Sequence, residues 1–276
     1  MFKGRELCIA TMHKKEKVIA PILKKSLALK CFTPKEFNSD ILGTFSGEIE
    51  RIDDPIETAR KKCKMAIEVT GCELALASEG SFGPHPYIGF IPSDEEILFL
   101  YDKKNENEII VRELSTKTNF DGDDFSSYTK LKEFAKGVLF PSHGIILKDS
   151  KSKQIIKGIT TWKELEKSFH ELSKSGLPIK AETDMRAMFN PTRMEVIKAC
   201  TEKLLQAMLS ECPACNLPGF VATSGEPGLP CEQCNLPTRS ALKHIYKCKK
   251  CNHEQLKLYP HGKTKEEPTF CDFCNP

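Results

Sequence analysis

The chain has 276 residues with a formal net charge of +3, and hydrophobic residues make up 39% of it. This length exceeds the usual size of one domain, so two domains are expected, and the charge is too small to mark the chain as a nucleic-acid-binding protein. The first residues hold only a short apolar run before charges resume, which argues against a signal peptide or a membrane span and favours a soluble, cytoplasmic protein.

Strand and helix patterns alternate in the N-terminal part. Residues 7–10 are an apolar run typical of a buried strand, a polar loop follows over 11–17, and apolar residues recur at helical spacing over 18–27. A second helix is expected from Pro55, because proline is favoured in a first helical turn. Gly71 is expected to end this helix, and residues 74–77 then predict a second buried strand.

The middle of the chain predicts further short elements before a long helix. We expect a Gly/Pro-rich loop over 80–86, strands over 88–91, 97–101, 109–114, 137–147 and 154–156, and a helix over 162–172. Pro191 opens an amphipathic helix that runs toward a group of cysteines. The patterns predict an α/β domain with a mixed sheet over 1–190, a connecting helix over 191–210 and a small module over 211–276.

Four Cys-x-x-Cys pairs lie in the last quarter of the chain. They are Cys212/Cys215, Cys231/Cys234, Cys248/Cys251 and Cys271/Cys274. Two cysteines on a tight turn, a zinc knuckle, can direct both sulfur atoms at one ion, and two knuckles complete a tetrahedral site. The gaps between pairs are near the roughly 15–20 residues typical of zinc sites. The eight cysteines therefore predict two structural Zn²⁺ ions in a double zinc-ribbon-like module.

Disulfides are the alternative interpretation of these cysteines. They need an oxidising compartment, to which nothing in the sequence directs the chain. For the zinc sites, sequential pairing is expected, with the first knuckle joined to the second and the third to the fourth, because shorter loops cost less entropy. A closed Cys₄ site has no open coordination position, so these ions are expected to stabilise structure and not to catalyse a reaction.

Two resemblances follow from short motifs. Over nearly its full length the chain resembles an uncharacterised family of bacterial proteins with an N-terminal α/β domain and C-terminal Cys-x-x-Cys knuckles. The motifs are ATMHKKEK, FSGEIER, SEGSFGPHP, RELSTKTNF, TDMRAMFNPTRM, GLPCEQCNLPTR and CDFCNP. In motif order, the first 190 residues also resemble the inosine triphosphate pyrophosphatase superfamily, which uses Mg²⁺ to cleave nucleoside triphosphates to monophosphate and pyrophosphate.

The second resemblance implies a set of site residues. The superfamily opens with Ala-Thr-x-Asn-x-x-Lys, and the segment here places His13 at the Asn position and Lys17 one residue late. Its helical Glu-Asn-Ala-x-x-Lys-Ala motif resembles residues 57–63, its acidic metal-binding motif resembles residues 78–80, and its base-reading motif resembles residues 183–186. The implied metal-binding catalytic residues are Glu79 and Glu57, and the implied substrate-binding residues are Thr11, His13, Lys17, Lys62 and Arg186.

The physical chemistry of these residues permits this interpretation and a simpler one. Carboxylates at a helix start and a strand end can bind Mg²⁺, and lysines before a helix N-terminus can meet phosphates. Glu57 is equally favoured in a first turn by the helix dipole alone, and the lysines over 14–17 are typical of a solvated face. Arg186 and Arg193 can clamp phosphate, or they can pair with Asp184 and Glu195.

Two functions of different classes are therefore expected. The first is a Mg²⁺-dependent nucleoside triphosphate pyrophosphohydrolase with an appended zinc module. The second is a protein without catalytic activity, whose zinc module binds nucleic acid or another protein. Zinc ribbons serve both kinds of protein, so the cysteines alone do not discriminate between them.

Overall fold

A computed structural model of the chain describes residues 1–34, 54–149 and 151–276. The FSGEIER motif, residues 45–51, lies outside the described residues. The chain divides into two compact units, residues 1–205 and 206–276. Among the described residues, none of the helices combines the length and the apolar character needed to cross a membrane.

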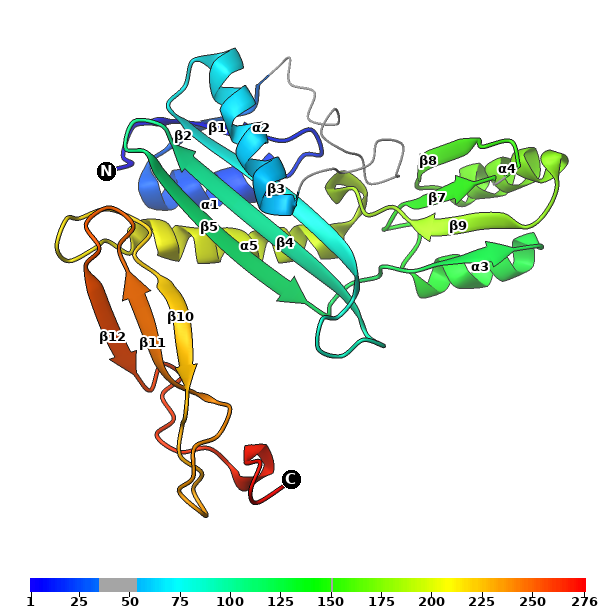
Figure 1. The fold of residues 1–276 in the computed structure, drawn as a ribbon. Coiled ribbons are helices and arrows are strands. Elements are labelled where there is room, and N and C mark those ends of the chain that lie inside the picture. The colour runs from blue at the N-terminus through cyan, green and yellow to red at the C-terminus, as the bar shows by residue number, and fades with distance from the viewer. Residues whose placement is uncertain (35–53, 150) are drawn as a thin grey trace. The chain divides into compact units, whose positions relative to one another are not determined.

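The first sheet of the N-terminal unit is mixed and has the strand order β2-β1-β3-β4-β5 (Figure 1). Its strands are β1 (Glu6–Ala10), β2 (Lys30–Phe32), β3 (Leu74–Pro84), β4 (Pro92–Asp102) and β5 (Asn107–Ser115). β1 is parallel to β2 and β3, and β4 is antiparallel to both of its neighbours. The prediction of an α/β fold with a mixed sheet is confirmed.

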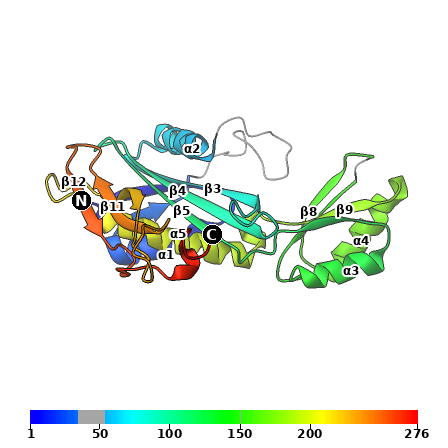
Figure 2. The same cartoon turned by 60° about the horizontal axis from the view of Figure 1, so that its bottom comes forward.

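Helices cover both faces of this sheet. They are α1 (Glu16–Leu27), α2 (Pro55–Thr70) and α5 (Pro191–Leu209), which continues into the second unit. Figure 2 shows α2 on one face, and α1 with the N-terminal part of α5 on the other. The Asp54 side chain caps α2, and Gly71 ends it with a φ of 71°. Buried residues of α2 pack on β1, β3 and β4, so this core fixes the strand ends that carry the predicted site.

Two details of the first sheet differ from the sequence prediction. Residues 80–84 were expected in a loop, but β3 continues to Pro84, where it pairs with Pro92. The expected strand over 88–91 is wrong, since these residues belong to the connection between β3 and β4. Glycine and proline at the strand end gave a turn signal, yet the pairing with β4 holds this segment extended.

A second, antiparallel sheet in the same unit has the order β6-β9-β7-β8. Its elements are β6 (Gly122–Phe125), α3 (Tyr128–Gly137), β7 (Ile145–Lys148), β8 (Ile155–Ile159), α4 (Trp162–Leu172) and β9 (Ile179–Thr183). Buried residues from α3, α4, β7 and β9 share one core. The strand expected over 137–147 is largely wrong, because residue 137 ends α3 and β7 begins only at Ile145.

The C-terminal unit contains a three-stranded antiparallel sheet of order β10-β11-β12. The strands are β10 (Ala222–Pro227), β11 (Ala241–Lys247) and β12 (Glu254–Leu258). Residues of β10 and β12 are exposed throughout, and none of β11 is fully buried. This sheet therefore lacks an apolar core of its own, and the cysteine pairs lie before, between and after its strands.

Candidate functional site

The four Cys-x-x-Cys segments form the same local turn. In each, the backbone N–H of the asparagine after the second cysteine donates to the carbonyl oxygen of the first, at 2.8 to 3.0 Å. Asn216, Asn235 and Asn252 have φ values of 58° to 59°, a left-handed conformation that asparagine tolerates well. The asparagines therefore fit the knuckle turns.

The turns bring the eight cysteines together in two groups of four. One group is Cys212, Cys215, Cys248 and Cys251, and the other is Cys231, Cys234, Cys271 and Cys274. Within each group the sulfur atoms all lie within 4.8 Å of one another. The expected sequential pairing is therefore wrong: the first knuckle joins the third, and the second joins the fourth.

Strand length explains this interleaved pairing. β10 has six residues and β11 has seven, so each carries the chain about 20 Å from one end of the sheet to the other. β10 and β11 are antiparallel, so the third knuckle returns to the end where the first one lies. β12 runs antiparallel to β11 and sends the chain back toward the second knuckle. The entropy of loop closure changes too slowly with loop length to oppose this geometry.

Sulfur separations in both groups fit a tetrahedral zinc ion. A zinc–sulfur bond of about 2.3 Å implies sulfur atoms about 3.8 Å apart. The Cys212–Cys251 and Cys215–Cys248 separations are both 3.6 Å. In the other group, Cys231 and Cys274 are 3.9 Å apart and Cys234 and Cys271 are 3.6 Å apart.

The knuckle backbone also favours thiolates. The backbone N–H of Cys234, together with that of Gln233, lowers the pKa of Cys231 to about 7. Burial raises the pKa of Cys248, but N–H groups of Cys251 and Lys250 outweigh it and lower the value to about 6. The thiolate is the form of cysteine that binds metal, and the knuckle backbone favours it at Cys231 and Cys248.

In the N-terminal unit, the structure brings together two of the predicted site residues, Glu79 and Lys62. Glu79 lies on β3 and is 2% exposed, and the Lys62 Nζ from α2 lies 2.6 Å from its Oε1. A buried carboxylate needs such a partner, since an unpaired charge is costly away from water. The pair therefore links α2 to the sheet near the end of the parallel strands.

Glu57, the second predicted carboxylate, has a different partner. Glu57 forms an ion pair with Arg60, its side chain is 47% exposed, and Arg60 also binds Glu108 at 2.8 Å. Lys17 is exposed, and Thr11 and His13 are half-buried in the loop before α1. A first-turn glutamate with a partner one turn later needs no ligand to explain it.

Arg186 pairs with its neighbour Asp184, as the simpler interpretation expected. Its Nη2 donates to Asp184 Oδ2 at 2.6 Å, and its guanidinium lies 4.6 Å from the centroid of the Phe189 ring. Asp184 is fully buried and also accepts the Gly158 N–H. Arg193 does not pair with Glu195, because its Nε donates to Glu96 Oε1 at 2.5 Å instead.

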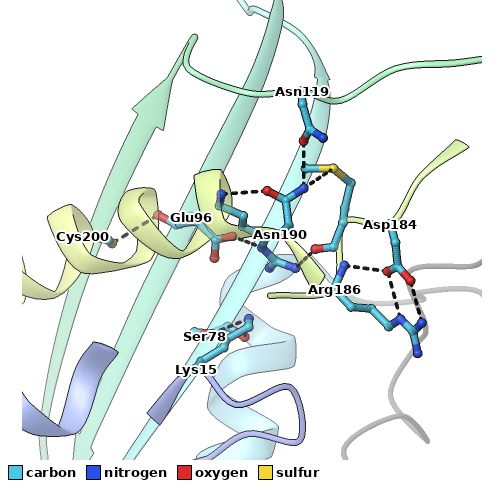
Figure 3. Close-up of polar contacts among 10 residues, drawn as sticks. Lys15, Ser78, Glu96, Asn119, Asp184, Arg186, Asn190 and Cys200 are labelled. Carbon is cyan, nitrogen blue, oxygen red and sulfur yellow. Dashed lines mark hydrogen bonds and ion pairs between the residues drawn. The ribbon is translucent and has the colours of Figure 1, made fainter. Parts of the chain in front are cut away.

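The sequence missed a buried charge cluster, which comprises Lys15, Asp94, Glu96 and Arg193. Lys15 is 4% exposed, and its Nζ donates to the Ser78 hydroxyl at 2.6 Å (Figure 3). Burial, and then repulsion from Arg193, lowers the pKa of Lys15 to about 8. The solvated face predicted for the lysines over 14–17 is therefore wrong for Lys15. The sequence signal for its burial was its position at the end of the loop that joins β1 to α1.

Asp94 and Glu96 complete this cluster from β4. Both are fully buried, and each opposes a residue of β3: Phe82 faces Asp94, and Gly80 faces Glu96. Burial, followed by repulsion from Glu96, raises the pKa of Asp94 to about 8. Asp94, Glu95 and Glu96 form an uninterrupted acidic run, which is typical of an exposed segment, so nothing in this run predicts that α5 covers it.

A known family model matches most of the chain. A model of a domain of unknown function, DUF6671, matches residues 62–276, which is more than half of the chain. The match includes Glu79, Asp94, Glu96 and all eight cysteines of the two groups. No curated protein matches the chain, and the resemblance to the inosine triphosphate pyrophosphatase superfamily stays a prediction. The chain belongs to the DUF6671 family of domains of unknown function.

Proposed function

We propose that the chain is a zinc-binding protein whose C-terminal unit holds two structural Zn²⁺ ions, one in each Cys₄ group. The observation that carries this proposal is the convergence of four sulfur atoms in each group, at separations that suit a tetrahedral ion. Four thiolates leave no coordination position for water or substrate. The ions therefore stabilise the unit and do not take part in a reaction.

Metal analysis of the purified, unchelated full-length chain tests this proposal. We expect two equivalents of zinc, and we expect the Cys231→Ser variant to retain fewer than two. Cys31→Ser is the matched control, because Cys31 lies on β2, is half-buried and belongs to neither group. One equivalent or none in the wild-type chain would rule out the proposal.

A second candidate function concerns the N-terminal unit: Mg²⁺-dependent release of pyrophosphate from a nucleoside triphosphate. The Lys62–Glu79 pair supports it, since a carboxylate and a lysine lie together where β3 passes the end of the parallel strand β1. Ligands of open α/β sheets bind outside such strand ends. In this reaction Glu79 would bind Mg²⁺ with Glu57 as its partner, and Lys17, Lys62 and Arg186 would contact the nucleotide.

Pyrophosphate release from a panel of nucleoside triphosphates, with and without Mg²⁺, tests the second candidate. Glu79→Gln should lower turnover by roughly a hundredfold, because a lost metal ligand costs several kcal/mol of transition-state stabilisation. Lys104→Ala is a suitable control, because it changes a charge in the turn between β4 and β5. If no triphosphate is hydrolysed, the remaining proposal is a non-enzymatic protein whose zinc module binds a nucleic acid or a protein partner.

A further inference from the structure

Two carboxylates in the N-terminal unit are buried with incomplete partners. Asp94 and Glu96 are each 0% exposed. Among the described residues, neither oxygen of Asp94 has a hydrogen-bond partner, and Glu96 Oε2 also lacks one. Buried carboxylate oxygens are normally paired with donors or bound to metal ions, so three such oxygens in one place require an explanation.

The strand geometry points both side chains to the same place. Asp94 and Glu96 are two residues apart on β4 and therefore extend from the same face of the sheet. The backbone of β3 approaches closely there, because a Cβ added to Gly80 would lie 2.6 Å from Glu96 Oε1. The residue between them, Glu95, extends from the opposite face and pairs with Arg112.

The neighbouring cationic side chains, Arg193 and Lys15, do not donate hydrogen bonds to these three oxygens. Arg193 donates to Glu96 Oε1 and to the carbonyl oxygen of Met185, and it packs 5.0 Å from the Phe82 ring centroid. Lys15 donates to the hydroxyl and the carbonyl oxygen of Ser78 (Figure 3). Both cations therefore have bonds of their own, and neither hydrogen-bonds to Asp94.

We propose that Asp94 and Glu96 bind one divalent cation of the Mg²⁺ or Mn²⁺ class. Carboxylate oxygens suit these hard cations, which complete an octahedron with water or with ligand oxygens. The two ligands are carboxylates and not thiolates, so the site differs chemically from the two Cys₄ groups. It also excludes Glu79, which neighbours Gly80 on β3 and therefore extends from the opposite face of the sheet.

The charge of the cluster indicates what the bound cation would attract. Asp94 and Glu96 formally balance Lys15 and Arg193, so a divalent cation would add two positive charges. An anionic co-ligand, such as a phosphate group, would complement this excess. Binding of the cation does not require such a ligand. The proposal of a cation site is therefore independent of whether the chain hydrolyses nucleoside triphosphates.

Titration of the zinc-loaded full-length chain with MnCl₂ tests the proposal, with free Mn²⁺ followed by electron paramagnetic resonance. We expect one bound Mn²⁺ per chain in the wild type. Asp94→Asn should weaken this binding by about tenfold or more, because it removes a charged ligand. Glu95→Gln is the matched control from the opposite face of the same strand, and its Mn²⁺ binding should equal that of the wild type.

Thermal melting separates loss of the site from loss of the fold. Without Mn²⁺, Asp94→Asn should melt at the wild-type temperature or above it, since a neutral amide replaces a buried carboxyl group that is costly to ionise. Added Mn²⁺ should raise the melting temperature of the wild type and of Glu95→Gln, but not of Asp94→Asn. The proposal is wrong if the wild type binds no Mn²⁺ at millimolar concentration, or if Asp94→Asn binds it as tightly as the wild type. Zinc content, measured in the same samples, should be unchanged in all three proteins.

Discussion

Arg193 connects several parts of the N-terminal unit through a single buried side chain. It donates to Glu96 on β4 and to the carbonyl oxygen of Met185, and its backbone N–H is capped by the Asn190 side chain (Figure 3). Its guanidinium occupies space that the lack of a side chain at Gly80 leaves open. Side chains around this buried charge are closely packed, so adding even one methyl group nearby should change the stability of the fold.

Gly80→Ala tests this close packing. A Cβ at residue 80 would lie 2.4 Å from Arg193 Nη2 and 2.6 Å from Glu96 Oε1, so the ion pair must shift. We expect the free energy of unfolding to fall by about 1–3 kcal/mol, as in other overpacked cores. Urea denaturation measures this change. Gly83→Ala is the control on the same strand, because nothing lies within 4 Å of its added Cβ; equal effects of the two substitutions would contradict the explanation.

The Arg5–Asp102 ion pair gives a pH-dependent prediction. Burial alone would raise the pKa of Asp102, but hydrogen bonds from Arg5 and Asn105 outweigh it and lower the pKa below 3.8. Arg5 donates to both Asp102 oxygens, at 2.6 and 2.8 Å. A lowered pKa in the folded state means that the pair stabilises the fold above pH 3.8, and that this stability is lost as pH falls through the lowered value.

Asp102→Asn should therefore destabilise the chain by about 2 kcal/mol at neutral pH, since it removes charge-assisted hydrogen bonds. The difference between the urea midpoints of wild type and variant should shrink as the pH falls from 5 toward 3. Both proteins carry the same cysteines, so any loss of metal in acid cancels in the comparison. A difference that grows on acidification would contradict the assigned role of the pair.

At the scale of elements, α1, α2, α4 and α5 were predicted from local signals, whereas α3 was missed. The helix over 162–172 matches α4, which begins at an N-cap where the Thr161 hydroxyl accepts the Glu164 N–H and donates to the Glu164 carboxylate. α2 begins at Pro55 and is ended by Gly71, as expected. The capping residues of a helix and its apolar periodicity are both contained in one short stretch of sequence, so such a helix can be predicted without knowledge of its partners.

Several strands with weak local signals, which form by pairing with distant segments, were not predicted. β6 and β9 were missed, although they pair with each other along four residues each. The hairpin formed by β3 and β4 extends beyond its apolar part because Gly80–Pro84 pair with Pro92–Glu96. The sites show the same contrast between local and long-range information. All eight cysteines were identified from their local spacing, whereas their pairing depends on the directions of the strands. The charge cluster was missed because α5, which is distant in sequence, buries it.

At the scale of the whole molecule, the two units differ in what holds them together. The N-terminal unit has extended apolar cores beneath its two sheets. In the C-terminal unit, the buried cluster around the first Cys₄ group consists of Cys212, Leu217, Phe220 and Cys248. A unit of about 70 residues with so small a core needs metal ions or a comparable reinforcement to fold.

Removal of zinc should therefore unfold one unit selectively. Structural zinc contributes about 10–16 kcal/mol per site in small zinc-finger peptides, far more than this core can replace. After chelation, we expect fast amide hydrogen exchange throughout residues 206–276 and protected amides in β1, β3 and β4. Peptide-resolved mass spectrometry makes the comparison. Loss of protection in both units together would contradict the assignment of zinc to local stability.

The zinc content of two double variants tests the interleaved Cys₄ groups most directly. Cys215 and Cys248 belong to one group, whereas Cys215 and Cys231 belong to different groups. Cys215→Ser with Cys248→Ser should therefore lose one equivalent of zinc and keep the other. Cys215→Ser with Cys231→Ser should lose both equivalents. The opposite result, with one ion lost from the second variant and two from the first, would show that successive knuckles share an ion and would contradict the interleaved arrangement.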